Sequence, residues 1–257
     1  ILGELMRDHI LLGGDPARIS VEGLNDVCGP GKGWWTVDPL DGSLNYKVSL
    51  PYWNGLPYTA CVTVLNASGP EQATFGHIVM AAIADLRYAP ALSCVSAHNN
   101  AVRHPNDDFF SCCSSYQLRG QYSPKRQNRF LVTSSATKLD LASQIVIGEM
   151  YYPENREMLT RAFAGQKGWL RNPGSAAYEM TLVASGQAVA FICDRQKQHE
   201  LGAGYLLVKG ALGATVDFDG RDLSERPYDF KTPTPVVLAA NQAIAEQILE
   251  LLVKAKS

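Results

Sequence analysis

The chain has 257 residues, of which 46% are hydrophobic and 19% charged, a composition typical of a globular protein with a sizeable core. A formal net charge of -2 gives no global basic field, so we expect no nucleic acid as a stable partner. No apolar run approaches the roughly 18 residues of a membrane span, so we expect no membrane partner. We expect a cytoplasmic protein, although a targeting peptide upstream of Ile1 is compatible with a sequence that does not begin with Met.

Hydrophobic periodicity predicts the elements of the first half. We expect a helix at residues 1–12, a flexible loop at 29–33, and strands at 34–37, 56–66 and 74–83. The strand at 34–37 should end at Asp38, because Pro39 disfavours a helix there. Residues 95–128 are polar and irregular, so they are expected to form a long surface excursion.

Strands and helices alternate in the second half. The predicted strands are 129–133, 188–193 and 235–240, and the predicted helices are 153–164, 175–185, 199–212 and a closing helix striped by Ile244, Ile248, Leu251 and Leu252. Because both halves contain helices and strands, we predict an α/β protein in which helices pack on sheets.

The most informative stretch is Asp38-Pro39-Leu40-Asp41-Gly42-Ser43, where two carboxylates lie three residues apart at the end of a predicted strand. Both carboxylates and the Leu40 carbonyl can converge on one point, and Mg²⁺ prefers such oxygen ligands together with water and substrate phosphate. The backbone N–H groups of residues 42–44 can face an anion. The pattern indicates a site for metal and phosphate; the alternative is an Asp at a turn followed by an N-capping Asp.

Two further groups of residues give weaker evidence for a site when each is considered alone. In Asn172-Pro173-Gly174-Ser175-Ala176-Ala177, small residues open a predicted helix and let a ligand approach the backbone, but ordinary helix starts have the same pattern. Glu200 lies in the first turn of its predicted helix, where the helix dipole favours a negative charge as well as a metal would. His199 is expected to be a structural residue at the N-cap of that helix.

Residues 38–46 resemble the signature of the inositol monophosphatase family, which belongs to a lithium-sensitive, metal-dependent phosphatase superfamily that includes fructose-1,6-bisphosphatases and bisphosphate nucleotidases. The resemblance continues in order at residues 19–22, 174–186 and 199–220. It implies an α-β-α-β-α sandwich with mixed and antiparallel sheets. It also implies a homodimer and a single catalytic domain over residues 1–257, with halves of about 1–128 and 129–257 and a family N-terminal segment missing upstream.

The resemblance further implies roles for individual residues in hydrolysing a small phosphomonoester, inositol monophosphate first of all, by a metal-activated water. Two or three Mg²⁺ ions would be held by Glu22, Asp38, the Leu40 carbonyl, Asp41 and Glu200. The catalytic residues would be Glu22, Asp41 and Ser43, whose hydroxyl would orient the attacking water. The substrate would be bound by Gly42, Ser43, Gly174, Ser175, Ala176, Cys193 and Asp194.

Several positions depart from the family pattern. Ser43 replaces a Thr, Gly23 replaces a second Glu, and Cys193 stands where a Glu often meets substrate hydroxyls. Glu200 replaces the usual Asp, as in the fructose-bisphosphatase branch, and no Asp lies at the expected distance upstream of Glu22. The alternatives are therefore a fructose-1,6-bisphosphatase or bisphosphate nucleotidase, and, in a different class, a non-catalytic relative that binds a ligand or partner.

Overall fold

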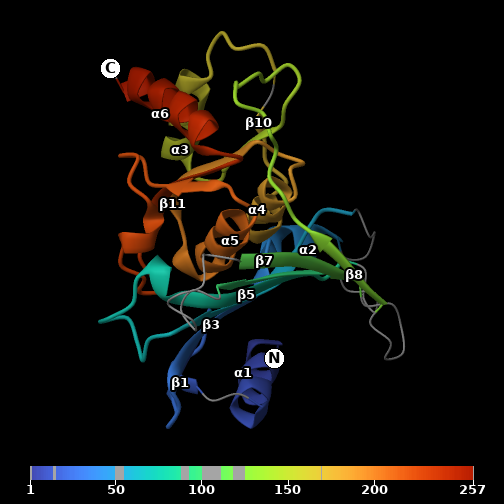
Figure 1. Ribbon diagram of the computed structural model, residues 1–257, viewed down its shortest axis with the longest axis vertical. Coiled ribbons are helices and arrows are strands. Elements are labelled where there is room, and N and C mark those ends of the chain that lie inside the picture. The colour runs from blue at the N-terminus through green and yellow to red at the C-terminus, as the bar shows by residue number, and fades with distance from the viewer. Residues whose placement is uncertain are drawn as a thin grey trace.

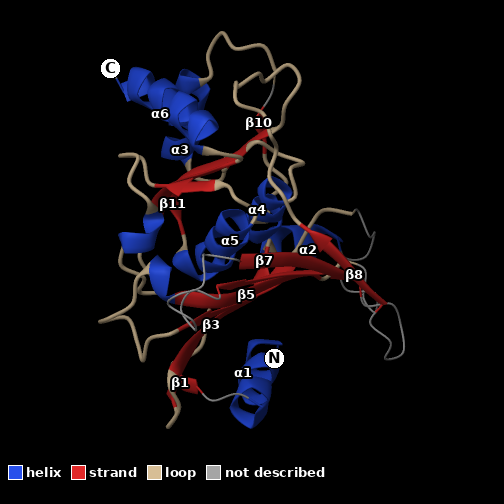
Figure 2. Ribbon diagram, viewed as in Figure 1, coloured by secondary structure: helices blue, strands red, loops and turns tan. Residues whose placement is uncertain are grey.

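The computed structural model describes residues 2–13, 16–49, 55–87, 93–99, 111–117, 125–168 and 170–256. Helices and two sheets alternate in five layers (Figures 1 and 2). In order, the layers are α1 (Leu2–Gly13), an eight-stranded sheet, a middle layer with α4 (Ala176–Ala184) and α5 (Gln198–Gly210), a five-stranded sheet, and the pair α3 (Pro153–Ala162) and α6 (Gln242–Lys256). The predicted α/β sandwich is confirmed.

The larger sheet has the order β2-β1-β3-β4-β5-β6-β7-β8. Its strands are β1 (Pro16–Val21), β2 (Val27–Cys28), β3 (Gly33–Asp41), β4 (Thr59–Leu65), β5 (Ile78–Asp85), β6 (Ser93–Asn99), β7 (Ser111–Gln117) and β8 (Lys125–Phe130). β1 and β3 are parallel, and every other neighbouring pair is antiparallel. This parallel pair matters for the site, because β1 and β3 end at the same edge of the sheet.

The expected surface excursion at 95–128 is wrong, because this stretch contains most of β6 and all of β7. Their polar sequences gave no apolar alternation, but β6 pairs with the edge of β5, and β7 pairs in turn with β6. Residues 100–110 and 118–124 of the stretch lie outside the described residues. The strand predicted at 129–133 overlaps β8 only at residues 129–130, which are the last two residues of β8.

The smaller sheet has the order β10-β9-β11-β13-β12. β9 (Val146–Gly148) is parallel to β10 (Leu170–Arg171) and β11 (Ala190–Gln196), while β13 (Thr234–Ala239) is antiparallel to β11 and β12 (Ala214–Val216). The strands predicted at 188–193 and 235–240 are confirmed as β11 and β13. β9 and β12 escaped prediction because three residues are too few to show an alternation.

The predicted helices are confirmed as α1, α3, α4, α5 and α6, with ends that differ by a few residues. The structure adds a short helix, α2 (Ser43–Ser49), and the 3-10 turns η1 (Phe75–His77) and η3 (Leu223–Glu225). Within the described part of the chain, none of the helices has the length and apolar character needed to cross a bilayer.

The middle helix α5 is buried along nearly its whole length, because one sheet covers it on each side (Figure 1). Tyr228 fixes where this helix begins: its hydroxyl donates to the Gln198 carbonyl at 3.1 Å and lies 2.9 Å from Thr36 Oγ1 on β3. Its ring packs edge-on against Trp34 and Phe75. The first turn of α5 is thereby held against β3, which carries two of the predicted site residues.

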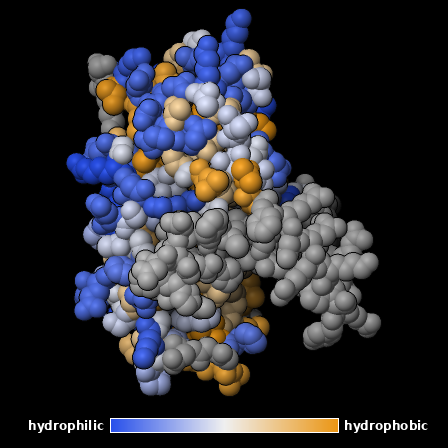
Figure 3. Space-filling model, in the orientation of Figure 1, coloured by the Kyte–Doolittle hydropathy of each residue, from blue (hydrophilic) through white to orange (hydrophobic). Residues whose placement is uncertain are grey.

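Helix α1 forms the end of the molecule that lies opposite α3 and α6 (Figure 1). Ile10 is buried with Ile19 and Val37 against the larger sheet, whereas Leu5 and Leu12 are 62% and 88% exposed. Figure 3 shows hydrophobic side chains gathered at this end of the molecule, where Figure 1 places α1. The helix thus presents apolar surface on both of its faces.

Candidate metal and substrate site

Four acidic side chains that are distant in the sequence meet at one edge of the larger sheet. Glu22 directly follows β1, Asp38 and Asp41 lie in the last part of β3, and Glu200 is in the first turn of α5. Because β1 and β3 are parallel neighbours, their ends lie together, and the Glu22 N–H donates to the Val37 carbonyl at 2.9 Å. The fold therefore brings together the four carboxylates that the sequence resemblance indicated.

Asp38 is the common member of two possible ligand groups. Its ligand atoms lie within 4.8 Å of those of Asp41 and Glu200, and also within that distance of those of Glu22 and His199. The Asp38 side chain is fully buried; its Oδ1 accepts from the Leu40 N–H at 2.9 Å, but Oδ2 accepts no hydrogen bond from any described residue. A buried carboxylate oxygen without a donor is costly, so this donor set fits divalent cations such as Mg²⁺.

Asp41 is held in place from the second half of the chain. Its Oδ2 accepts hydrogen bonds from Ser175 Oγ at 2.7 Å, the Ala177 N–H at 2.8 Å and Thr59 Oγ1 at 3.3 Å. Burial, followed by the nearby charge of Glu200, raises the pKa of Asp41 to about 7. Three donors on one oxygen fix the carboxylate, which leaves its other oxygen for a cation.

His199 is not the N-cap that we expected from the sequence, because α5 begins one residue earlier, at Gln198, and Lys197 is its N-cap. The imidazole lies inside the acidic cluster instead. Its Nε2 is 3.3 Å from Glu22 Oε1, 3.6 Å from Glu200 Oε1 and 3.8 Å from Asp38 Oδ2. Lys197 Nζ lies 3.1 Å from the same Glu22 oxygen.

The charges in this cluster shift one another strongly. Burial first, and then Glu200, Asp41 and Glu22, raise the pKa of Asp38 to about 9. The His199 imidazole beside it lowers the pKa of Glu22 to about 2. Burial alone would lower the pKa of His199, but the surrounding carboxylates outweigh burial and raise it to about 10. Four carboxylates thus face two basic side chains, a balance that bound cations would complete.

A cavity of about 760 Å³ opens beside the cluster. Of the predicted site residues, its lining includes Glu22, Asp38, Leu40, Asp41, Gly42, Ser43, Gly174, Ala176 and Glu200. Lys47, Arg195 and Lys197 add positive charge to the lining. The cavity therefore combines possible cation ligands with groups that attract an anion.

The family model that describes the inositol monophosphatase family matches residues 12–257. The chain belongs to the inositol monophosphatase family. Among curated proteins, the chain is 24% identical over 230 residues to the fructose-1,6-bisphosphatase/inositol-1-monophosphatase of Archaeoglobus fulgidus, covering 88% of this chain and 72% of that protein. It is 23% identical over 222 residues to the Nus factor SuhB of Xylella fastidiosa, covering 85% of this chain and 67% of that protein.

Solved structures support the same fold. The fructose-1,6-bisphosphatase of Leishmania major superposes with a TM-score of 0.71 at 14% identity, covering 100% of this chain and 81% of that chain. An inositol monophosphatase (IMPase) of Thermotoga maritima superposes with a TM-score of 0.67 at 15% identity, covering 98% of this chain and 80% of that chain. Both chains are longer than this one and share its layers of helices and sheets.

Three residues expected to bind substrate in this family do not line the cavity. Ser175 is 1% exposed, and its hydroxyl is used by Asp41. Cys193 is buried in the main core as a free thiol, and the Asp194 N–H is bonded to Asn155 Oδ1 at 3.2 Å. The register of β11 shifts between Cys193 and Gln196, so residues 195–197 reach the cavity in their place.

Two polar residues that sequence analysis missed shape the substrate side. Asn45 Nδ2 donates to the Pro57 carbonyl at 2.7 Å and to the Pro173 carbonyl at 2.8 Å. Glu179 is fully buried, and its Oε1 accepts the Gly174 N–H at 2.7 Å. A polar residue inside each family segment was the available signal. The partners of Asn45 lie 12 and 128 positions away, too far along the chain to be predicted, whereas the bond between Glu179 and Gly174 is local.

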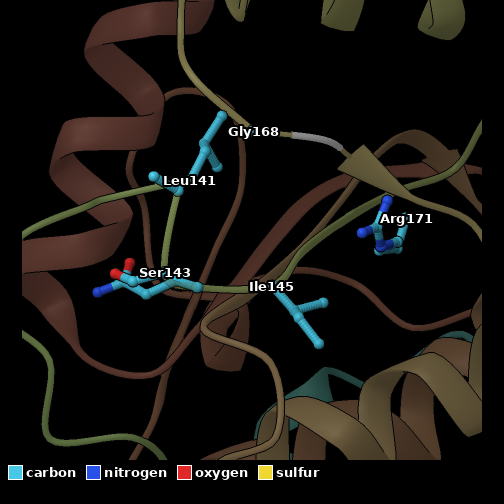
Figure 4. Close-up of a pocket in the computed structure, with 7 residues that line it drawn as sticks. Leu141, Ser143, Ile145, Gly168 and Arg171 are labelled. Atoms are coloured by element: carbon cyan, nitrogen blue, oxygen red, sulfur yellow. The ribbon is translucent and has the colours of Figure 1, made fainter.

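A second cavity, of about 460 Å³, lies in the smaller-sheet half of the molecule (Figure 4). Figure 4 shows that Leu141, Ser143 and Ile145 come from one segment, whereas Gly168 and Arg171 come from another. Arg171 is the one charged side chain in its lining, and no carboxylate lies there among the described residues. This cavity lacks the ligand chemistry of the first, so we place the candidate active site at the acidic cluster.

Proposed function

We propose that this protein hydrolyses a small phosphomonoester with the help of divalent cations, of which we favour Mg²⁺. Glu22, Asp38, the Leu40 carbonyl, Asp41 and Glu200 would hold the cations. The observation that carries the proposal is the buried Asp38 Oδ2, which has no hydrogen-bond donor among the described residues and faces the other carboxylates beside a cavity of about 760 Å³.

When bound, the cations supply neutralisation of the phosphoryl charge and lower the pKa of a water nucleophile. The protein positions the phosphoryl group and the attacking water. Gly42 adopts a φ of +77°, and a Cβ added there would lie 2.9 Å from the Pro57 carbonyl oxygen and from Ser175 Cβ, so only glycine lets this turn pack against those segments at the edge of the cavity. The N–H groups of Gly42 and Ser43 would donate to phosphoryl oxygens, and the exposed Ser43 hydroxyl would orient the attacking water.

The substrate we favour is inositol monophosphate, and the description of the matched family supports this choice. A substrate with a second anionic group, such as fructose-1,6-bisphosphate or a nucleotide bisphosphate, is favoured by a different observation. Lys47, Arg195 and Lys197 all line the cavity, and the nearest carboxylate to Arg195 is 3.5 Å away, on Asp194. A panel of these phosphate esters, compared by kcat/KM, separates the two possibilities.

The test of the proposed reaction is phosphate release with Mg²⁺, with excess chelator and with Li⁺, from the wild type and from Asp41→Asn. The Asn carbonyl oxygen can keep the three donors of Asp41, whereas its amide cannot bind a cation, so we expect turnover to fall at least about 100-fold with the fold intact. Glu157→Gln is the matched control, because its carboxylate is 65% exposed on α3. Full activity in chelator, or in Asp41→Asn, would overturn the metal mechanism.

A second candidate is a non-catalytic protein that binds a ligand or partner. The observation that favours it is the pairing of Glu22 with Lys197 and His199, which lets basic side chains stand where a cation is expected. Calorimetry with Mg²⁺ and inorganic phosphate, beside the activity assay, distinguishes the two. Binding without turnover of any ester in the panel would support the second candidate and overturn the first.

A further inference from the structure

The imidazole of His199 occupies an unusual position in the molecule. Its side chain is 7% exposed, and its Nε2 makes no hydrogen bond of regular geometry to a described residue, although oxygens of Glu22, Glu200 and Asp38 lie 3.3 to 3.8 Å away. The ring lies 5.2 Å from the Phe230 ring, which packs beside it. A buried ring nitrogen without a regular hydrogen bond therefore points into a cluster of carboxylates, in which the buried Asp38 Oδ2 also lacks a hydrogen-bond donor.

The spacing of these atoms is close to that of ligands sharing one ion: one pair has the expected separation, and the other is somewhat longer. Two ligands each about 2.1 Å from a metal lie about 3.0 Å apart in an octahedron and about 3.4 Å apart in a tetrahedron. His199 Nε2 lies 3.3 Å from Glu22 Oε1 and 3.8 Å from Asp38 Oδ2. The three atoms come from the end of β1, from β3 and from α5, so the fold holds a mixed nitrogen and oxygen donor set.

We propose that His199 Nε2 is a metal ligand, and that together with Glu22 and Asp38 it makes one cation position of this site prefer a first-row transition metal such as Mn²⁺ or Zn²⁺ to Mg²⁺. The ion would displace the proton from the imidazole and release it to solvent. The neutral imidazole nitrogen suits transition metals, whereas Mg²⁺ selects oxygen. The inference rests on the proposed metal site but not on catalysis. It adds a ligand and a metal preference that the carboxylates alone would not give.

Lys197 competes with an ion for the same oxygen of Glu22, from which its Nζ lies 3.1 Å away. Its side chain is 45% exposed, so it has room to rotate into solvent when an ion binds. His199 has no such room, because the ring is enclosed between the carboxylates and Phe230. The imidazole is thus the fixed group and the lysine the displaceable one.

The first test needs no variant. The full chain is prepared with ¹⁴N-histidine and with ¹⁵N-histidine, loaded with Mn²⁺ without substrate, and measured by pulsed electron paramagnetic resonance. We expect a nitrogen coupling of directly bound imidazole that changes with the isotope. A Mn²⁺ spectrum without any imidazole coupling would overturn the proposal.

The second test is calorimetric titration of Mn²⁺, Zn²⁺ and Mg²⁺ into the wild type and His199→Gln. Gln replaces the nitrogen ligand with an oxygen, so we expect Mn²⁺ and Zn²⁺ affinity to fall at least about tenfold more than Mg²⁺ affinity. His9→Gln, at an exposed position of α1, should leave all three affinities unchanged. An equal loss for all three ions in a folded His199→Gln protein would contradict the proposal. Neither measurement uses phosphatase activity. A protein that shows no phosphatase activity would therefore contradict the proposed function and leave the proposed His199 ligand standing.

Discussion

The hydroxyl of Ser175 donates a 2.7 Å hydrogen bond to Oδ2 of Asp41, although 134 positions separate the two residues. A residue at the start of α4 therefore orients a carboxylate on β3. Ser175 acts through Asp41 and does not line the cavity, so we regard it as a positioning residue.

We expect Ser175→Ala to lower turnover by roughly 10–100-fold, because loss of a hydrogen bond that orients a metal ligand typically costs that much. The change should raise the Mg²⁺ concentration needed for half-maximal activity more than it raises KM for the ester. Titration of activity against Mg²⁺ checks this. A change in KM alone would show that Ser175 serves the substrate and not Asp41.

Asp38→Asn should stabilise the metal-free protein while removing its response to metal. The Asn carbonyl oxygen can keep the Leu40 N–H, and its amide replaces a crowded, donor-less carboxylate oxygen. We expect an increase of about 0.5–2 kcal/mol in the free energy of unfolding in chelator, a common exchange of function for stability. Urea unfolding with and without Mg²⁺ measures both effects. Asp219→Asn, whose carboxylate is 67% exposed, is the control; a metal-free Asp38→Asn protein less stable than wild type would contradict the prediction.

Gly42→Ala separates crowding from backbone strain when it is compared with Gly165→Ala. Both glycines have a positive φ, +77° at Gly42 and +78° at Gly165. A Cβ at Gly42 would lie 2.9 Å from the Pro57 oxygen and from Ser175 Cβ, whereas a Cβ at Gly165 would have no neighbouring atom within 4 Å. Both variants should lose about 1–3 kcal/mol from strain. Only Gly42→Ala should lose more than this and also lose activity. Equal losses in unfolding experiments would show that the close approach at Gly42 is unimportant.

Glu179 should make stability fall as pH rises. Burial, followed by the charge of Glu149, raises the pKa of Glu179 well above its ordinary value of 4.5. Above pH 4.5 the unfolded chain releases this proton while the folded protein keeps it, so the folded state becomes less favourable until its own pKa is reached. Glu179→Gln removes this release, and its stability relative to wild type should rise by up to about 1.4 kcal/mol per pH unit in that window.

Urea unfolding of Glu179→Gln at several pH values from 4 to 8 checks the sign. Glu157→Gln, with its exposed carboxylate, should follow the wild-type curve throughout. A Glu179→Gln curve that runs parallel to wild type across the window would show that the buried carboxyl does not carry the expected proton.

Much of the site could be predicted from the sequence because its core is local. Asp38, Asp41 and Gly42 occur in one string, and the strand before it is visible as an apolar run. The pairing with Glu22 and Glu200 depended on the resemblance, because it needs the register of β1 against β3 and the start of α5. No local pattern contains such long-range geometry.

The errors have the same physical origin. His199 was assigned to a helix N-cap, but its ring is drawn into a cluster made by three separate elements. Ser175 and Cys193 were assigned to substrate, but burial and the shifted register of β11 turn them towards Asp41 and the core. Strands β6 and β7 were missed because their sequences lack a clear alternation, while the structure adds β6 to the edge of β5 and β7 to the edge of β6.

The double hydrogen bond of Asn45 ties together three parts of the chain that are distant in the sequence. One amide nitrogen donates to both the Pro57 and the Pro173 carbonyl, so the segments before β4 and before α4 are joined to α2 at a single point. Ser175, which orients Asp41, follows Pro173 by two residues. Loosening this joint would therefore disturb the metal site through a side chain that touches none of its ligands.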